Sequence, residues 1–283
     1  MKDYTDRHFT GERALFRERD AVIDHCLFDD GESPLKEGRN LVVKNTTFGW
    51  KYPLWYGDGH LVQHCTFLEM SRSGLWYTNN STFEDCDIIA PKEFRRSHDL
   101  SLRNIVFHNA QETLWTCHNV IMDNVKAKGD YFGMNSTSLK IRDFHLDGNY
   151  PFDGGKDIEI TDSVLNSKDA FWNCENVTLR NCTINGEYFG WNSKNIVLEN
   201  CTITSHQGFC YMENLTLRNC SVLDGTDLAF EYCSNIDVQT DGILPSVKNP
   251  YSGIIRARFI TDLIMDKDAG IDPSKTTVIT EDK

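Results

Sequence analysis

Three nearly identical stretches decide the fold: NVTLRNCTI at residues 176–184, NIVLENCTI at 195–203 and NLTLRNCSV at 214–222. Each stretch begins 19 residues after the one before it, and the register extends in both directions to give twelve consecutive units. The units begin at Asp20, Asn40, Gly59, Asn80, Asp99, Asn119, Ser138, Asp157, Asn176, Asn195, Asn214 and Asn235. A repeat of this length is typical of solenoids, in which each unit forms one coil and packs against its neighbours.

Apolar and polar residues alternate within each unit, as in a β-strand with one buried face. The third residues after the starts are all apolar: Ile23, Val43, Val62, Phe83, Leu102, Met122, Ile141, Ile160, Leu179, Leu198, Leu217 and Val238. So are the eighth residues: Phe28, Phe48, Phe67, Ile88, Phe107, Ala127, Leu146, Leu165, Ile184, Ile203, Val222 and Ile243. Because 19–21 residues are too few for a strand, a helix and their loops, we predict three short strands per coil. The predicted fold is an all-β, single-stranded, right-handed parallel β-helix of about 12 coils, since parallel crossovers are nearly always right-handed.

The fifth residue after each start is most often Asn or Asp, which tolerate left-handed backbone and form local hydrogen bonds. The asparagines at this position are Asn45, Asn104, Asn124, Asn181, Asn200 and Asn219. Stacked from coil to coil, their amides can bond to one another. We therefore predict an asparagine ladder with a structural role, at a sharp bend between two strands.

The repeat leaves a segment outside it at each end of the chain. Residues 1–19 carry mixed charges around two apolar side chains and are predicted to form an N-terminal cap. The β-helix is assigned to residues 20–243, and residues 244–283 to C-terminal capping strands and a polar tail. Caps are expected because an open sheet edge invites aggregation.

Charge and hydropathy narrow the class of partner. The 283 residues contain 29 Lys and Arg against 42 Asp and Glu, a net charge of −13. This disfavours nucleic acid and anionic membrane as main partners, since both require a basic face. No apolar run approaches the roughly 20 residues of a membrane span, and the first ten residues lack the apolar stretch of a signal peptide. We predict a cytoplasmic protein.

The ten cysteines are predicted to be free thiols. Six of them share the sixth position after a unit start: Cys26, Cys65, Cys86, Cys182, Cys201 and Cys220. A stacked column of small buried thiols explains this placement, and a disulfide between parallel neighbours would be strained. A linear column does not converge on a metal ion, and there is no C-x-x-C motif. No cofactor or metal is expected.

Five of the six tryptophans fall in one column of the third predicted strand: Trp55, Trp76, Trp115, Trp172 and Trp191. The preceding residue is mostly Leu or Phe and is predicted to be buried. The tryptophan column also contains Arg95 and Asp153, so it is predicted to face outward. An exposed apolar stripe usually indicates a contact surface, and flat aromatic faces suit sugar rings. The alternatives are that a loop or a second copy of the chain covers the stripe, or that the indoles lie in the core.

A charged cluster interrupts this stripe at Glu93, Arg95, Arg96, His98 and His118. The two histidines hold the same place on adjacent coils. Imidazoles and a carboxylate can act as acid and base, and arginine can hold a carboxylate or phosphate. We predict Arg95, His98, His118 and Glu93 as candidate catalytic residues, and Arg96 together with the tryptophans as substrate-binding residues. The alternative is a solvated turn with ordinary ion pairs.

With its asparagine column, the N-[LIV]-x-[LIV]-x-N-C-[TS]-[IV] coil resembles the pectate-lyase-like superfamily of right-handed β-helices over residues 20–243. More narrowly, residues 9–16, 24–37 and 50–56 resemble an uncharacterised bacterial family with this fold, which brings no activity. In the wider superfamily, pectate lyases carry calcium-binding aspartates and an arginine base, and polygalacturonase-like hydrolases carry paired aspartates, His-Gly and Arg-x-Lys. Neither His-Gly nor Arg-x-Lys occurs here, and the single Asp-Asp pair, Asp29-Asp30, lies in the first coil.

Two function classes remain open from the sequence. The first is a carbohydrate-binding or carbohydrate-active β-helix, in the latter case a lyase, hydrolase or epimerase acting on a saccharide, with an acidic group of the ligand neutralised by Arg95. The second is a non-catalytic scaffold whose tryptophan stripe binds protein, including another copy of itself as a homo-oligomer.

Overall fold

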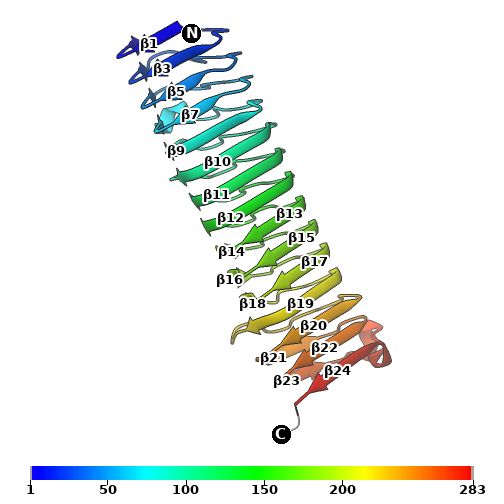
Figure 1. Cartoon of the computed structure of the whole chain (residues 1–283). Helices are drawn as coiled ribbons and strands as arrows, with labels where there is room; N and C mark the ends of the chain where they lie inside the picture. Colours follow the sequence, from blue (N-terminus) through cyan, green and yellow to red (C-terminus); the bar gives the residue numbers. More distant parts are fainter. Residues whose placement is uncertain (1, 282–283) are drawn as a thin grey trace. The chain divides into compact units, whose positions relative to one another are not determined.

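The computed structural model describes residues 2–281 and consists almost entirely of β-strands (Figure 1). Helical turns among these residues are limited to three 3-10 segments, η1 (Glu69–Ser71), η2 (Lys267–Ala269) and η3 (Pro273–Lys275). The chain divides into two compact units, residues 1–146 and 147–283. Each unit is a parallel β-solenoid, so the predicted all-β parallel β-helix is confirmed.

The first unit stacks its strands in parallel along two sides of each coil. The short strands are β1 (Lys2–Thr5), β2 (His8–Phe9), β3 (Ala21–Asp24), β4 (Leu27–Phe28), β5 (Val42–Lys44), β6 (Thr47–Phe48), β7 (Leu61–Gln63) and β8 (Thr66–Phe67), and the longer ones are β9 (Ser81–Ile88), β10 (His98–Phe107), β11 (His118–Lys128) and β12 (Thr137–Asp147). Like residues lie above like, as in the register pairs Val43↔Val62 and Leu102↔Met122. The predicted register of the repeat is therefore correct in this unit.

The second unit repeats the arrangement. Its strands are β13 (Lys156–Thr161), β14 (Val164–Lys168), β15 (Glu175–Arg180), β16 (Thr183–Glu187), β17 (Lys194–Glu199), β18 (Thr202–His206), β19 (Glu213–Val222), β20 (Ile236–Thr240), β21 (Ile243–Lys248), β22 (Gly253–Ala257), β23 (Phe259–Ile264) and β24 (Thr276–Thr280). Leu179 pairs with Ile160 on one side and Leu198 on the other. A register irregularity between β19 and β20 ends the regular pattern, and Ile243, in the apolar eighth column, is 46% exposed.

The described residues form about 15 turns, so the prediction of about 12 coils is too low. At the N-terminal end, β1 already pairs in parallel with β3, within the segment expected to be a cap. At the C-terminal end, β22 pairs in parallel with both β20 and β24. Right-handed coiling and the three-part division of the chain stay predictions, and residues 282–283 of the predicted tail lie outside the described residues.

Up to residue 235, the third side of the coils differs from the prediction, because it is a run of turns and bends and not a strand. Alternate residues there have positive φ, as at Leu54 (57°) and Tyr56 (57°), and again at Leu75 (57°) and Tyr77 (58°). The coils are still joined, since the N–H of Leu75 donates to the preceding coil at Pro53 O and that of Tyr77 to the following coil at Arg95 O. The strict alternation of a strand is lost there, because Gly74 and Leu75 are both buried and Trp76 and Tyr77 are both half-buried.

Phenylalanine rings stacked along the coils form part of the interior of the first unit. The centroids of Phe9 and Phe28 lie 4.9 Å apart, those of Phe28 and Phe48 5.2 Å, and those of Phe48 and Phe67 4.8 Å. Phe48 and Phe67 have no exposed surface. The stack thus follows from the apolar eighth position of the repeat.

Side-chain amides hydrogen-bond from coil to coil at the bends. The Nδ2 of Asn200 donates to Asn181 Oδ1 (3.3 Å), and that of Asn219 to Asn200 Oδ1 (2.7 Å). A second series lies at the unit starts, where Asn195 donates to Asn176 and Asn214 to Asn195. All six residues have positive φ, the region that asparagine tolerates better than most residues.

All ten cysteines are free and buried, as predicted. Cys182, Cys201 and Cys220 lie on successive coils, and each Sγ donates to the carbonyl oxygen two residues earlier, at Arg180 (3.2 Å), Glu199 (3.3 Å) and Arg218 (3.4 Å). These thiols behave as small core side chains.

Candidate functional site

Trp55, Trp76 and Trp115 of the first unit lie on the third side of the coils, where they are half-buried. The residues before them, Leu54 and Leu75, have no exposed surface. The predicted inward and outward assignment of this segment is therefore correct for these coils, although the segment is not a strand.

The indole faces of this column are covered by the column itself. Trp55 and Trp76 stack with centroids 5.4 Å apart and planes 10° apart. The guanidinium of Arg95 then lies between two indoles, 5.0 Å from the centroid of Trp76 and 4.2 Å from that of Trp115. The indole N–H of Trp55 donates to Ser73 O (2.6 Å). The stripe therefore presents ring edges to its surroundings, which does not fit the predicted stacking of sugars on flat indole faces.

Arg95 is neutralised within the protein. Its Nη2 lies 2.6 Å from Glu112 Oε2, and Lys92 Nζ lies 3.2 Å from the same oxygen. Burial raises the pKa of Glu112, but the hydrogen bonds from Arg95 and Lys92 outweigh this and lower it. The arginine is thus held by a carboxylate and two rings, so the predicted pairing with a substrate acid does not fit its surroundings.

Glu93 lies inside the coil, with no exposed surface. Its Oε1 accepts from the Gly74 N–H (3.1 Å), while Oε2 has no hydrogen-bond partner. Burial raises the pKa of Glu93 well above its usual value. Gly74 presents a backbone N–H at this position. The equivalent residue one coil earlier, Pro53, has no N–H, so a buried carboxyl would find no such donor there. Glu93 is not brought to the surface with the other candidate residues.

Replacing Glu93 by Gln is expected to change how the free energy of unfolding depends on pH. Above pH 4.5 the unfolded chain releases this proton while the folded protein keeps it, so the wild type loses stability as pH rises. The wild type should gain stability relative to Glu93→Gln as pH falls from 7 to 5, by up to about 1.4 kcal/mol per pH unit. Urea denaturation at the two pH values measures this, and parallel pH profiles of the two proteins would contradict it.

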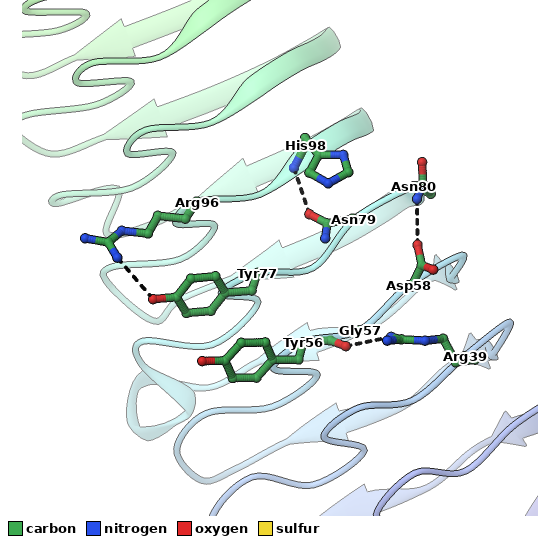
Figure 2. A pocket seen from close by; sticks show the side chains of 9 residues that line it. All are labelled: Arg39, Tyr56, Gly57, Asp58, Tyr77, Asn79, Asn80, Arg96 and His98. Atoms are coloured by element: carbon green, nitrogen blue, oxygen red, sulfur yellow. Dashed lines mark hydrogen bonds between the residues drawn. The ribbon is translucent and has the colours of Figure 1, made fainter.

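A groove of about 510 Å³ opens beside the aromatic column in the first unit (Figure 2). Its lining residues are Arg39, Tyr56, Gly57, Asp58, Tyr77, Asn79, Asn80, Arg96 and His98. The rings of Tyr56 and Tyr77 are stacked, with centroids 4.6 Å apart and planes 1° apart. A neighbouring pocket of about 310 Å³ is lined by Trp76, Arg95, Trp115 and Thr116, and shares Tyr77 and Arg96 with the groove. The two hollows together place aromatic edges next to cationic and amide groups.

The polar groups of the groove are held by coil-to-coil hydrogen bonds (Figure 2). Arg39 Nη1 donates to the carbonyl oxygen of Tyr56 (2.7 Å). Asn79 Oδ1 accepts from the backbone N–H of His98 (3.0 Å). Asp58 Oδ1 accepts from Asn80 Nδ2 (2.6 Å). Because these bonds link successive coils, the geometry of the groove depends on the stacking of the solenoid.

The two predicted histidines are brought together, because His98 on β10 and His118 on β11 are register partners. Nδ1 of His98 lies 2.7 Å from Asp99 Oδ2, and Nδ1 of His118 lies 2.8 Å from Thr137 Oγ1. Hydrogen bonds from Asn119 and His98 lower the pKa of Asp99. Asp99 thus orients the imidazole of His98, which lines the groove.

The other two predicted tryptophans, Trp172 and Trp191, belong to the second unit. Their centroids lie 5.8 Å apart. The column continues through Tyr211, Tyr232 and Tyr251 at successive separations of 4.8, 5.2 and 5.4 Å. These tyrosines were not among the predicted site residues.

Sequence reasoning also missed several residues of the groove in the first unit, namely Arg39, Tyr56, Asp58, Tyr77 and Asn79. One signal was available, because Trp is followed by Tyr in two consecutive coils, at Trp55-Tyr56 and Trp76-Tyr77. The groove otherwise combines residues from four coils. The repeat gives the coil to which each residue belongs but not which of their side chains line a common groove.

A family profile described as protein of unknown function (DUF3737) matches residues 2–279. The chain belongs to the DUF3737 family. The predicted family of unknown activity is thereby confirmed, whereas bacterial origin and membership of the pectate-lyase-like superfamily stay predictions. No curated protein matches this DUF3737 chain. None of the helices within residues 2–281 is long and apolar enough to cross a membrane, and the cytoplasmic location stays a prediction.

Solved structures similar to this DUF3737 chain have low sequence identity. The surface protein and adhesin PfbA of Streptococcus pneumoniae is 12% identical, with 93% of this chain and 79% of that chain covered and a TM-score of 0.36. The catalytic domain of a GH87 α-1,3-glucanase in complex with tetrasaccharides is 10% identical, with 99% and 63% covered and a TM-score of 0.28. HetL, a pentapeptide repeat protein from Nostoc, is 9% identical, with 82% and 86% covered and a TM-score of 0.23. Similarity at this level carries no functional argument.

Proposed function

We propose that the first unit binds a saccharide in the groove beside its aromatic column. The observation that carries this proposal is the lining itself, which combines tyrosine rings and hydroxyls with guanidinium, imidazole and amide groups. Saccharides present both hydroxyl rims and apolar C–H surfaces, and binding sites for small molecules combine apolar walls with a few placed polar groups. The function proposed is binding, and no reaction is assigned.

Two features support binding through hydrogen bonds and ring edges. The groove residues donate and accept around its length, with Arg39 and Arg96 as donors and Asp58 as an acceptor. The stacked tyrosines supply rigid walls at a low cost in conformational entropy, because neighbouring coils already fix their rings. Indole faces contribute little, since they are occupied by their neighbours in the column.

The second candidate function is a scaffold whose aromatic column binds protein, including a second copy of the chain. Its support is the column of ring edges, with Tyr56 42% exposed in the first unit and Tyr211 45% exposed in the second. The molecular mass in solution at micromolar protein concentration tests whether the chain associates with itself. A homo-oligomer that Trp115→Asp dissociates would favour the interface, and a monomer would leave self-association without support.

Isothermal titration of the full chain with a panel of oligosaccharides tests the proposal. Tyr77→Ala removes a groove wall and is expected to weaken binding by about 10-fold or more, since stacked aromatic contacts contribute on the order of 1 kcal/mol or above. Tyr211→Ala is the control, because this tyrosine is also stacked on a neighbouring ring and at positive φ, but lies in the second unit. Its affinity should equal that of the wild type. Failure of every saccharide to bind, or equal loss in both variants, would contradict the groove assignment.

A further inference from the structure

The charges around the groove are opposite to those of the chain as a whole. The chain carries a net charge of −13. The groove, by contrast, is lined by two arginines, Arg39 and Arg96, against a single acid, Asp58; His98 also lines it, but its Nδ1 is paired with Asp99 Oδ2 (2.7 Å). Asp58 is already engaged, because its Oδ1 accepts from Asn80. A local excess of positive groups in an acidic protein favours an anionic ligand at this place.

The adjacent arginines Arg95 and Arg96 differ in what they can still bind. The side chain of Arg95 is 17% exposed, pairs with Glu112 and lies between two indoles. Arg96 is exposed, and within residues 2–281 no carboxylate forms an ion pair with it. Its one side-chain hydrogen bond in this part of the chain is a long one, from Nη1 to the hydroxyl of Tyr77 (3.4 Å) (Figure 2). Arg96 therefore keeps donors and a charge without a paired carboxylate for a ligand, whereas the charge of Arg95 is paired with Glu112.

Arg39 provides a second cation, held in a fixed position. Its Nη1 donates to the carbonyl oxygens of Gly38 (3.1 Å) and Tyr56 (2.7 Å). Backbone carbonyls orient the guanidinium without neutralising its charge, and no ion pair joins it to an acid among the described residues. Guanidinium groups bind carboxylate and sulfate-like anions through paired N–H donors.

Resting on the proposed function, the geometry points to a saccharide that carries an anionic substituent, with Arg96 as the residue that selects for it. Arg39 adds a second positive charge along the same groove. Arg95 keeps a structural role as the cation stacked within the aromatic column. The anionic substituent is a carboxylate or a sulfate, because each presents a pair of oxygens that can accept from two N–H donors of a guanidinium.

Three hexasaccharide probes test the inference by titration of the full chain: an oligouronate, the same oligouronate with its carboxyl groups reduced to hydroxymethyl groups, and a sulfated neutral hexamer. The oligouronate or the sulfated hexamer should bind about 10-fold or more tightly than the reduced hexamer, as expected for a charge-assisted hydrogen-bonded pair. The tighter of the two anionic probes identifies the substituent. Its affinity should fall with rising salt, whereas that of the reduced hexamer should not.

Arg96→Gln should remove this preference and leave the affinity for the reduced hexamer unchanged. Arg103→Gln is the matched control, because Arg103 lies only seven residues later, on β10, is 53% exposed and pairs with Glu84 (2.8 Å) outside the groove. It should keep the preference. Equal affinities of the wild type for the charged and reduced hexamers would overturn the inference and leave the proposed function standing. If the wild type binds a neutral saccharide of the panel but neither anionic hexamer, the inference is likewise overturned and the proposed function stands. If it binds no saccharide, the inference and the proposed function are both overturned.

Discussion

Replacing Phe48 by Ala is expected to lower the free energy of unfolding by about 3–5 kcal/mol, the usual cost of removing a buried aromatic ring. Phe48 is fully buried between Phe28 and Phe67, with ring centroids 5.2 and 4.8 Å away. Both neighbours are held by their own coils, so they cannot close the cavity without disturbing the parallel register. Urea denaturation followed by circular dichroism measures the change.

The matched control for this prediction is Phe16→Ala. Phe16 is 37% exposed, so its removal leaves little cavity and should change the free energy of unfolding by less than about 1 kcal/mol. A loss below about 1 kcal/mol for Phe48→Ala as well would mean that the phenylalanine stack does not form as described.

The second large effect concerns His60, a buried imidazole in the first unit. Its Nδ1 accepts from the Leu41 N–H (3.3 Å), and Nε2 has no hydrogen-bond partner. Burial lowers the pKa of His60 to about 4; Asp58 opposes this shift and Arg39 adds to it. Gly57 makes the arrangement possible, because a Cβ there would lie 2.4 Å from His60 Nε2.

The folded protein should therefore lose stability in acid through this one residue. Between pH 6.5 and pH 4 the unfolded chain binds a proton at His60 that the folded protein does not, so unfolding is favoured as pH falls. The stability of the wild type relative to His60→Asn should fall by about 2–3 kcal/mol from pH 7 to pH 4.5. Asparagine keeps an acceptor for the Leu41 N–H but does not titrate.

Asparagine is smaller than histidine, and this alone changes the free energy of unfolding at any pH. The quantity to compare between the two proteins is therefore the change in that free energy from pH 7 to pH 4.5. His64→Asn serves as the control, because the side chain of His64 is 59% exposed. It should follow the wild type within about 0.5 kcal/mol. Identical pH profiles for the wild type and His60→Asn would contradict the burial of a neutral imidazole.

The fold could be predicted from the sequence because the 19-residue period and the alternation of residues are both visible without a structure. Leu54 and Leu75 were correctly assigned inward, because this position of the repeat is mostly Leu or Phe. The positive φ at Tyr56 and Tyr77 could not be predicted from that pattern. Leucine and tyrosine are not the residues by which positive φ is usually recognised, whereas the asparagines at the bends are.

The candidate site was predicted only in part. The column of Trp55, Trp76 and Trp115 follows from the repeat, but the coverage of indole faces depends on ring orientation, which spacing does not determine. Likewise, Arg95 and Arg96 are neighbours in the sequence with opposite surroundings. Only the coil-to-coil contact of Arg95 with Glu112, 17 residues later, distinguishes the neutralised arginine from the available one.

The most direct test of the saccharide groove is the indole N–H region of the ¹H–¹⁵N spectrum, recorded during titration of the full chain with a saccharide that binds. The six tryptophans report separately on the two units once Trp→Phe variants assign their signals. The signals of Trp76 and Trp115, which line the pocket adjoining the groove, should shift in a saturable manner. Those of Trp172 and Trp191 should remain in place. Saturable shifts confined to Trp172 and Trp191, or no shift in any of the four, would contradict the groove in the first unit.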